Sequence, residues 1–147
     1  MIPPPAPPTA PIGREAASSP SAISDKPRRH SLGAAFGYAF EGFATAWRAE
    51  RNLRIHAGIA AAALGGAAVL RLPVWGWALV ILAIALVIGA ELLNSALESV
   101  VDLVSPHDHP LAKRAKDVGA AAVLVAAAGA AAAGVLIAGW AIFGRML

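Results

Sequence analysis

The chain of 147 residues contains no cysteine, which excludes both a disulfide framework and a thiol nucleophile. Charged side chains are also scarce at 14%, whereas 58% of the residues are hydrophobic. A P-loop of the form G-x-x-x-x-G-K-[ST] is missing as well, so a nucleotide site of that type is excluded. The apolar composition lies outside the range of soluble globular domains. We conclude that the sequence encodes a membrane protein.

Two stretches without any formal charge are long enough to cross a bilayer. They cover residues 72–90 and 118–144, and each exceeds the roughly 18 residues that indicate a transmembrane helix. A third candidate over 55–70 is bounded by arginines and is shorter than usual, although snorkelling of those arginines would extend it. The sequence therefore predicts transmembrane helices over about 55–70, 73–103 and 115–143.

Lysine and arginine are distributed unevenly around these stretches. Arginines gather before the first stretch and "LAKRAK" separates the second from the third, whereas the opposite side has only Arg71 and Arg145. By the positive-inside rule, the N-terminus and the 103–117 loop are cytoplasmic, the C-terminus is outside, and the membrane is the inner one. The net charge of +3 thus follows from topology and requires no nucleic acid partner. Three tryptophans then meet at the outer interface: Trp75, Trp77 and Trp140.

The N-terminal part of the chain divides into two segments. Residues 1–30 hold most of the prolines and are predicted to form a disordered cytoplasmic tail, which leaves 31–147 as the membrane domain. Aromatic residues recur at helical spacing over about 31–54, which predicts an amphipathic helix lying on the membrane surface. These aromatic residues are Phe36, Phe40, Phe43 and Trp47.

Glu50 follows this aromatic stripe, and its spacing allows two interpretations. Continuing the helix places Glu50 on the aromatic side, where its carboxylate would point inward. Alternatively, Glu50 is exposed and pairs with Arg54 one helical turn later. Spacing alone leaves both open.

The end of the second predicted span, "ELLNSALESVVD" at 91–102, is unusually polar. At about 100° per residue, Glu98 and Asp102 each lie within roughly 20° of Glu91, so the three acids share one face and extend over about 16 Å of helix axis. Asn94 and Ser95 flank this acid stripe. Because the stripe runs from the hydrocarbon toward the cytosol, it can bring a membrane-bound substrate together with a water-soluble one.

Three explanations of the acid stripe compete. A purely structural one is an interhelical network in which Glu98 and Asp102 pair with Lys113, Lys116 or Arg54. Ionisable residues at membrane depth are costly, however, and usually mark function. The second explanation is a small proton-coupled transporter that uses the stripe. The third is an enzyme acting on a lipid headgroup, in which carboxylates serve as base and as Mg²⁺ ligands for phosphoryl transfer.

The 103–117 loop places cations beside the stripe. Lys116 and Asp117 lie where the third span begins, and a helix N-terminus attracts phosphate. His107 and His109 have a spacing that allows metal binding, but histidines beside prolines in a loop are more often plain interfacial residues.

Three segments resemble the small prokaryotic diacylglycerol kinase family, which includes undecaprenol kinases. They are "ERNLRIH" at 50–56, "ELLNSALESVVD" at 91–102 and "HPLAKRAKDVGAAAVL" at 109–124, and the resemblance covers about residues 35–140. It implies an all-α, three-span membrane protein with an N-terminal surface helix, assembled as a homotrimeric bundle. It also implies transfer of the γ-phosphoryl group of ATP to a lipid hydroxyl with Mg²⁺.

The resemblance also implies roles for individual residues. Glu91 matches the catalytic base, Asn94 matches the asparagine of the same motif, and Glu50 and Glu98 match metal-binding glutamates. The residues expected at the nucleotide are Tyr38, Glu50, Glu98, His107, Asp108, His109, Lys116 and Asp117. The residues expected at the lipid substrate are Arg54, Glu91, Ser95 and Asp102. "RIH" and "HPLAK" favour the undecaprenol kinase branch, so the acceptor is either diacylglycerol or undecaprenol.

Overall fold

The structure, a computed structural model, describes residues 31–144. Within that range the chain forms four α-helices and is all-α, as the sequence predicts. The proline-rich segment 1–30, predicted to be disordered, lies outside the described residues. The helices are α1 (Leu32–Ala49), α2 (Arg51–Val69), α3 (Val74–Val104) and α4 (Pro110–Phe143).

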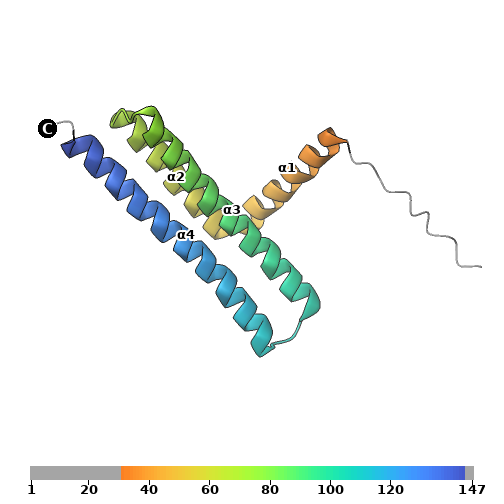
Figure 1. The fold of residues 1–147 in the computed structure, drawn as a ribbon. Coiled ribbons are helices and arrows are strands. Elements are labelled where there is room, and N and C mark those ends of the chain that lie inside the picture. The colour runs from red at the N-terminus through yellow and green to blue at the C-terminus, as the bar shows by residue number, and fades with distance from the viewer. Residues whose placement is uncertain (1–30, 145–147) are drawn as a thin grey trace, which may run out of the picture.

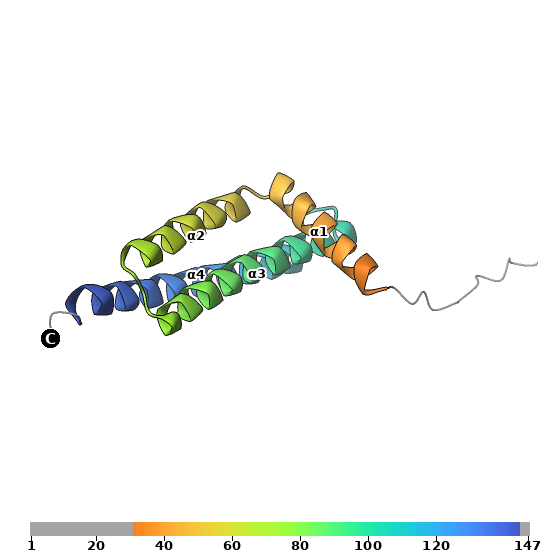
Figure 2. The same cartoon turned by 90° about the horizontal axis from the view of Figure 1, so that it is seen from above.

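The long helix α3 is the centre of the arrangement and contacts each of the other three. Helices α3 and α4 form a long antiparallel hairpin, and α2 packs against the first half of α3 (Figure 1). Helix α1 leaves the common direction of the other three at the start of α2, as both views show (Figure 2). The second half of α3 and the first half of α4 therefore extend beyond α2.

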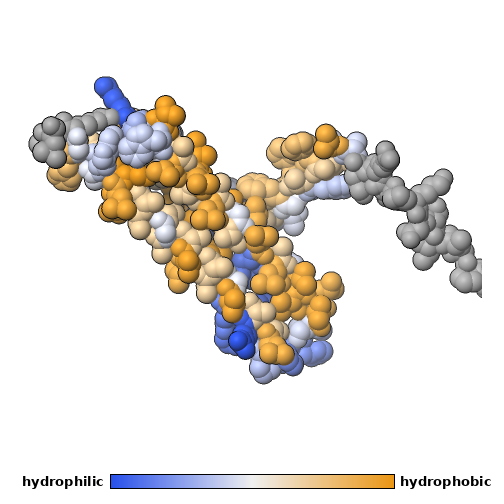
Figure 3. Space-filling view, in the orientation of Figure 1, coloured by the Kyte–Doolittle hydropathy of each residue, from blue (hydrophilic) through white to orange (hydrophobic). Residues whose placement is uncertain are grey.

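Within residues 31–144, two helices are long and apolar enough to cross a membrane, namely α3 and α4. Apolar residues cover much of their visible surface (Figure 3). Helix α2 has 19 residues, but Arg51, Arg54 and His56 in its first turns lower its hydropathy. The span predicted over 55–70 thus exists as a helix, and its crossing of the membrane remains a prediction.

The end of the bundle near the α2–α3 turn is the best-packed region. Ala67, Leu72, Ile137 and Ala141 form a buried cluster, with Trp77 packed against it. Beside this cluster the rings of Trp75 and Trp140 meet edge to face, with their centroids 4.7 Å apart. The predicted gathering of these tryptophans at one end of the bundle is therefore present.

The single surface helix predicted over 31–54 is interrupted at Glu50. This residue has extended backbone angles, φ −96° and ψ 115°, so residues 51–54 belong to α2. Arg54 stabilises the break, because its Nη1 donates to the carbonyl oxygens of Trp47 at 2.9 Å and Arg48 at 3.2 Å. The last carbonyls of a helix have no partner within the helix, and here a side chain from the next helix supplies one.

This arrangement predicts the effect of removing the Arg54 side chain. Arg54→Ala leaves the two carbonyls of α1 without their donor, so the junction should open more often. Cleavage after Glu50 by a glutamate-specific protease, measured on membranes, should become several-fold faster. Arg48→Ala is the matched control, because it removes a neighbouring arginine side chain but keeps the carbonyl that Arg54 contacts. Equal cleavage of the Arg54 and Arg48 variants would contradict this role.

The last helix begins earlier than predicted. Helix α4 starts at Pro110 rather than near residue 115, so "LAKRAKD" is helical instead of leading into the helix. Proline suits the first position of a helix because its missing N–H would be unpaired there in any case. The side chain of His109 completes the cap, since its Nδ1 accepts a hydrogen bond of 3.2 Å from the N–H of Leu111.

Candidate functional site

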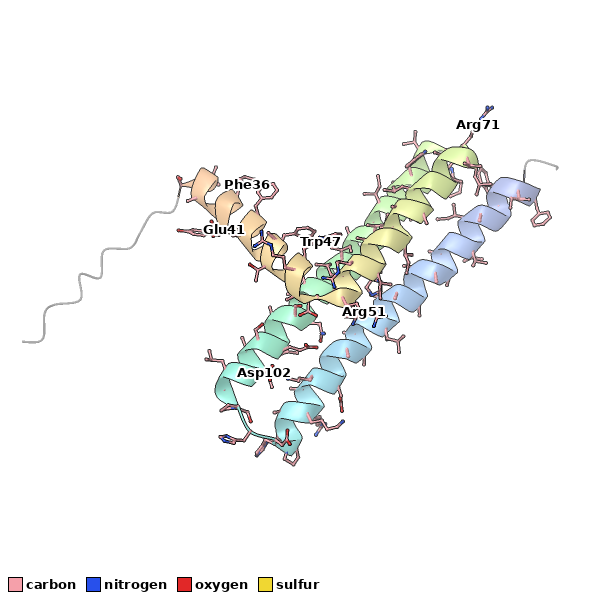
Figure 4. The ribbon with its side chains drawn as sticks, turned by 180° about the vertical axis from the view of Figure 1, so that it is seen from behind. Phe36, Glu41, Trp47, Arg51, Arg71 and Asp102 are labelled. Atoms are coloured by element: carbon pink, nitrogen blue, oxygen red, sulfur yellow. The ribbon has the colours of Figure 1, made fainter. Side chains whose placement is uncertain are left out.

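Glu91 is the one buried polar or charged side chain in the part of the chain that the structure describes, with an exposed fraction of 3%. It lies near the middle of α3. The junction between α1 and α2, which Arg51 marks in Figure 4, joins two helices that both contact α3. Glu50, Glu98 and His56 are close enough for their charges to act on Glu91. The fold thus brings Glu50, from the α1–α2 junction, near the acid stripe of α3.

The position of Glu50 tests the two interpretations of its spacing, an inward-pointing carboxylate or an exposed pair with Arg54. It is half-buried at the junction, and it lies near Glu91 rather than on the exposed aromatic face of α1. Two ion pairs occur among residues 31–144, and neither of them contains Glu50 or Arg54. The suggested Glu50–Arg54 pair is therefore wrong, because Arg54 instead contacts the carbonyls at the end of α1.

Asn94 holds the next acid of the stripe. Its Nδ2 donates a hydrogen bond of 2.8 Å to Oε1 of Glu98, one turn further along α3. The other end of the amide, Oδ1, is buried and has no hydrogen-bond partner among the described residues. Ser95 is half-buried beside Asn94, which keeps it near the stripe. The amide thus orients one carboxylate while keeping an acceptor of its own unused.

The exposed end of the stripe contacts α4. Lys116 Nζ lies 2.5 Å from Asp102 Oδ1, and Lys113 Nζ lies 2.5 Å from Asp117 Oδ2. The interhelical pairing considered as a structural explanation is therefore present for Asp102. Glu98 takes part in no ion pair within the described range. The two acids differ accordingly: Asp102 is joined to a cation, whereas Glu98 is oriented by an amide.

A pocket of about 700 Å³ opens at the α3–α4 loop, beside these ion pairs. It contains the loop residues expected at the nucleotide together with Lys116. Its lining residues are Ser105, Pro106, His107, Asp108, His109, Pro110, Ala112, Lys113 and Lys116. The two histidines have local contacts here: His109 caps α4, and the carbonyl of His107 accepts a hydrogen bond from Ser105 Oγ at 3.1 Å.

Some of the predicted site residues are not brought together. Tyr38 lies on α1, which projects away from the loop pocket, and is 59% exposed. Glu91 and Asp102 are eleven residues apart on one helix, or roughly 16 Å along its axis. Among residues 31–144, no group of three His, Cys, Asp or Glu side chains is arranged to hold a metal ion. A metal would therefore need ligands from outside these side chains.

The structure adds His56, which sequence reasoning did not select as a site residue. His56 lies on α2 near Glu91 and lines an apolar cavity of about 300 Å³ between α2, α3 and α4. His56 follows Glu50 by six residues, a spacing that does not place the two side chains on one face of a helix. The break at Glu50 also cannot be read from the sequence, so the proximity of both residues to Glu91 could not be predicted. The sequence did offer one signal for this residue: His56 follows Arg51 and Arg54 and stands at the start of the apolar part of the helix.

Comparison with known proteins extends these observations. Residues 37–138 match the family described as prokaryotic diacylglycerol kinase. Diacylglycerol kinase of Synechocystis is 46% identical over 100 residues, which cover 67% of this chain and 57% of that protein. Undecaprenol kinase of Bacillus subtilis is 40% identical over 102 residues, or 69% of this chain and 83% of that protein. Diacylglycerol kinase of Escherichia coli is 39% identical over 92 residues, which cover 63% of this chain and 75% of that protein.

Proposed function

This chain belongs to the prokaryotic diacylglycerol kinase family, a family of lipid kinases, and from that membership we propose that it phosphorylates a membrane lipid hydroxyl at the cytoplasmic interface with ATP and Mg²⁺. The acceptor is diacylglycerol or undecaprenol. The observation that carries this proposal is the buried carboxylate of Glu91 on an apolar helix, near Glu50 and Glu98. The transporter alternative is not favoured, because the similar proteins are named as kinases.

Glu91 acts as the general base in the proposed reaction. The lipid hydroxyl oxygen attacks the γ-phosphorus, the bond from that phosphorus to the β–γ bridging oxygen breaks, and ADP leaves. The hydroxyl proton passes to the Glu91 carboxylate. Burial near the middle of α3 suits this role, because a lipid headgroup reaches that depth and bulk water is excluded.

Glu50 and Glu98 are the residues that would hold Mg²⁺. This cation usually takes one or two carboxylates plus substrate phosphates, so two glutamates suffice without a third protein ligand. Bound there, it would neutralise charge on the phosphates of ATP. The hydrogen bond from Asn94 fixes one oxygen of Glu98 before any ligand arrives. The chemistry of this donor set therefore fits the ion.

The loop pocket is the proposed entry for ATP. Lys113 and Lys116 line it, and His107, Asp108 and His109 supply polar groups around it. Lys116 would exchange Asp102 for a phosphate oxygen, because a triphosphate carries more negative charge than one carboxylate. Tyr38 and Asp117 remain proposed nucleotide contacts, and Arg54, Ser95 and Asp102 remain proposed contacts of the lipid substrate.

We further propose a homotrimer in the inner membrane with the N-terminus in the cytoplasm. The small residues along α4 support close packing with another helix, since such residues let backbones approach in lipid. The exposed aromatic side chains of α1, including Phe36 at 66% and Phe40 at 75%, support a helix lying in the membrane interface. The oligomer can be measured by native mass spectrometry from detergent.

Purified protein in mixed micelles should consume ATP only when a lipid alcohol and Mg²⁺ are both present. An acceptor panel of diacylglycerol, undecaprenol and a sphingoid base, with the phosphorylated lipid detected directly, identifies the substrate class. Proton flux into proteoliposomes, driven by a solute and without lipid phosphorylation, would instead establish the transporter function.

A further inference from the structure

Gly119 on α4 lies directly against the amide of Asn94 on α3. A Cβ atom at Gly119 would stand 2.3 Å from Asn94 Oδ1 and 3.0 Å from Leu97 Cδ2. Real Cβ atoms do not approach other atoms to the first of these distances. Helix α4 is therefore this close to the acid stripe because residue 119 has no side chain.

This close approach is specific to one glycine of the helix. A Cβ atom at Gly129, further along α4, would meet nothing within 4 Å. The same holds for Gly134 and Gly139. Packing within this chain therefore accounts for the glycine at residue 119. It does not account for the glycines at the other three positions.

The consequences of an added methyl group fall on Asn94. Its Oδ1 faces Gly119 and is buried without a partner among the described residues, whereas its Nδ2 donates to Glu98. The amide is the end of a short side chain, so it can rotate, whereas α4 can move only as a whole helix packed along α3. Rotation that clears Oδ1 also carries Nδ2 away from Glu98. The fold would survive and the orientation of the carboxylate would be lost.

We propose that Gly119 is a positioning residue for Glu98. By leaving space for the Asn94 amide, it keeps Nδ2 on Oε1 of Glu98 and so keeps that carboxylate oriented toward the cation. The inference rests on the proposed role of Glu98 as a Mg²⁺ ligand. Loss of an outer-shell partner typically lowers metal affinity about 10–100-fold.

The test uses the full-length protein in detergent, with Mn²⁺ as a paramagnetic probe and a non-hydrolysable ATP analogue present. Gly119→Ala should raise the Kd for Mn²⁺ by about tenfold, measured by electron paramagnetic resonance. Its helicity and oligomeric state should stay unchanged. Gly129→Ala is the matched control and should bind Mn²⁺ like the unsubstituted protein, since a methyl group there meets no side chain of the chain.

A double-mutant cycle with Asn94→Ala separates positioning from a general packing effect. Once the amide is gone, a methyl group at 119 meets only the flexible end of Leu97 and has no amide to displace. Asn94→Ala and Asn94→Ala/Gly119→Ala should therefore have equal Kd values for Mn²⁺. A further loss in the double variant overturns the proposal, as does unchanged binding by Gly119→Ala. If Gly119→Ala alone does not accumulate in the membrane, the comparison between the two Asn94 variants decides. Failure of the unsubstituted protein to bind Mn²⁺ would instead overturn the proposed metal site itself.

Discussion

Glu91→Gln should lower the turnover number for lipid phosphorylation by about 10²–10⁴-fold, the usual contribution of a general base. The amide of glutamine has nearly the same shape as the carboxylate, so packing around this buried side chain is preserved. What it lacks is the ability to take the hydroxyl proton. MgATP binding should remain within about threefold, because binding does not need the base in its charged form. Initial rates and the Kd for a fluorescent ATP analogue measure the two effects separately.

Glu41→Gln is the matched control for this substitution. Glu41 is an exposed acid on α1, outside the group formed by Glu50, Glu91 and Glu98. Its activity should equal that of the unsubstituted protein. A Glu91→Gln variant that keeps substantial turnover, or that loses MgATP binding in parallel with turnover, would show that Glu91 is not the base.

Glu98→Gln should have a different signature. The glutamine Oε1 can still accept the hydrogen bond from Asn94, so the side chain keeps its orientation and loses only its charge. Mg²⁺ prefers anionic oxygen ligands. Removing a ligand should cost at least the roughly 10–100-fold in metal affinity that loss of an outer-shell partner costs. The concentration of Mg²⁺ that gives half-maximal activity should rise by that factor.

Glu50→Gln should shift the Mg²⁺ dependence in the same direction, since Glu50 is the other proposed ligand. High Mg²⁺ should recover much of the activity of both variants and none of the activity of Glu91→Gln. If all three variants show the same Mg²⁺ dependence, the roles have been divided wrongly among the acids.

Helical periodicity predicted a large part of this site. The acid stripe on α3 could be derived from spacing alone, because its residues lie on one uninterrupted helix. The charge-free stretches likewise predicted α3 and α4, the two helices within residues 31–144 that are apolar enough to cross a membrane. The gathering of Trp75 and Trp140 at one end of the bundle was also predicted, from the topology that these stretches and the arginines indicate.

Contacts between helices were beyond the reach of periodicity. The break at Glu50 depends on Arg54 reaching back to the carbonyls of α1, a tertiary contact that a smooth aromatic stripe does not reveal. The contact between Gly119 and Asn94 joins residues on different helices. Whether a side chain fits at residue 119 depends on the distance between the two helix axes. A sequence gives the faces of helices, whereas their distances depend on packing.

The length of α3 has a consequence for the electrostatics of the membrane surface. If α1 lies in the headgroup layer as proposed, the α3–α4 loop stands about 20 Å beyond the level of Glu91. This exceeds the Debye length of about 8 Å at physiological ionic strength. Anionic phospholipids attract lysine and arginine only within that distance. Lys113, Arg114 and Lys116 would thus be screened from the charged leaflet and remain available to attract ATP, so that nucleotide capture becomes independent of the phospholipid composition around the protein.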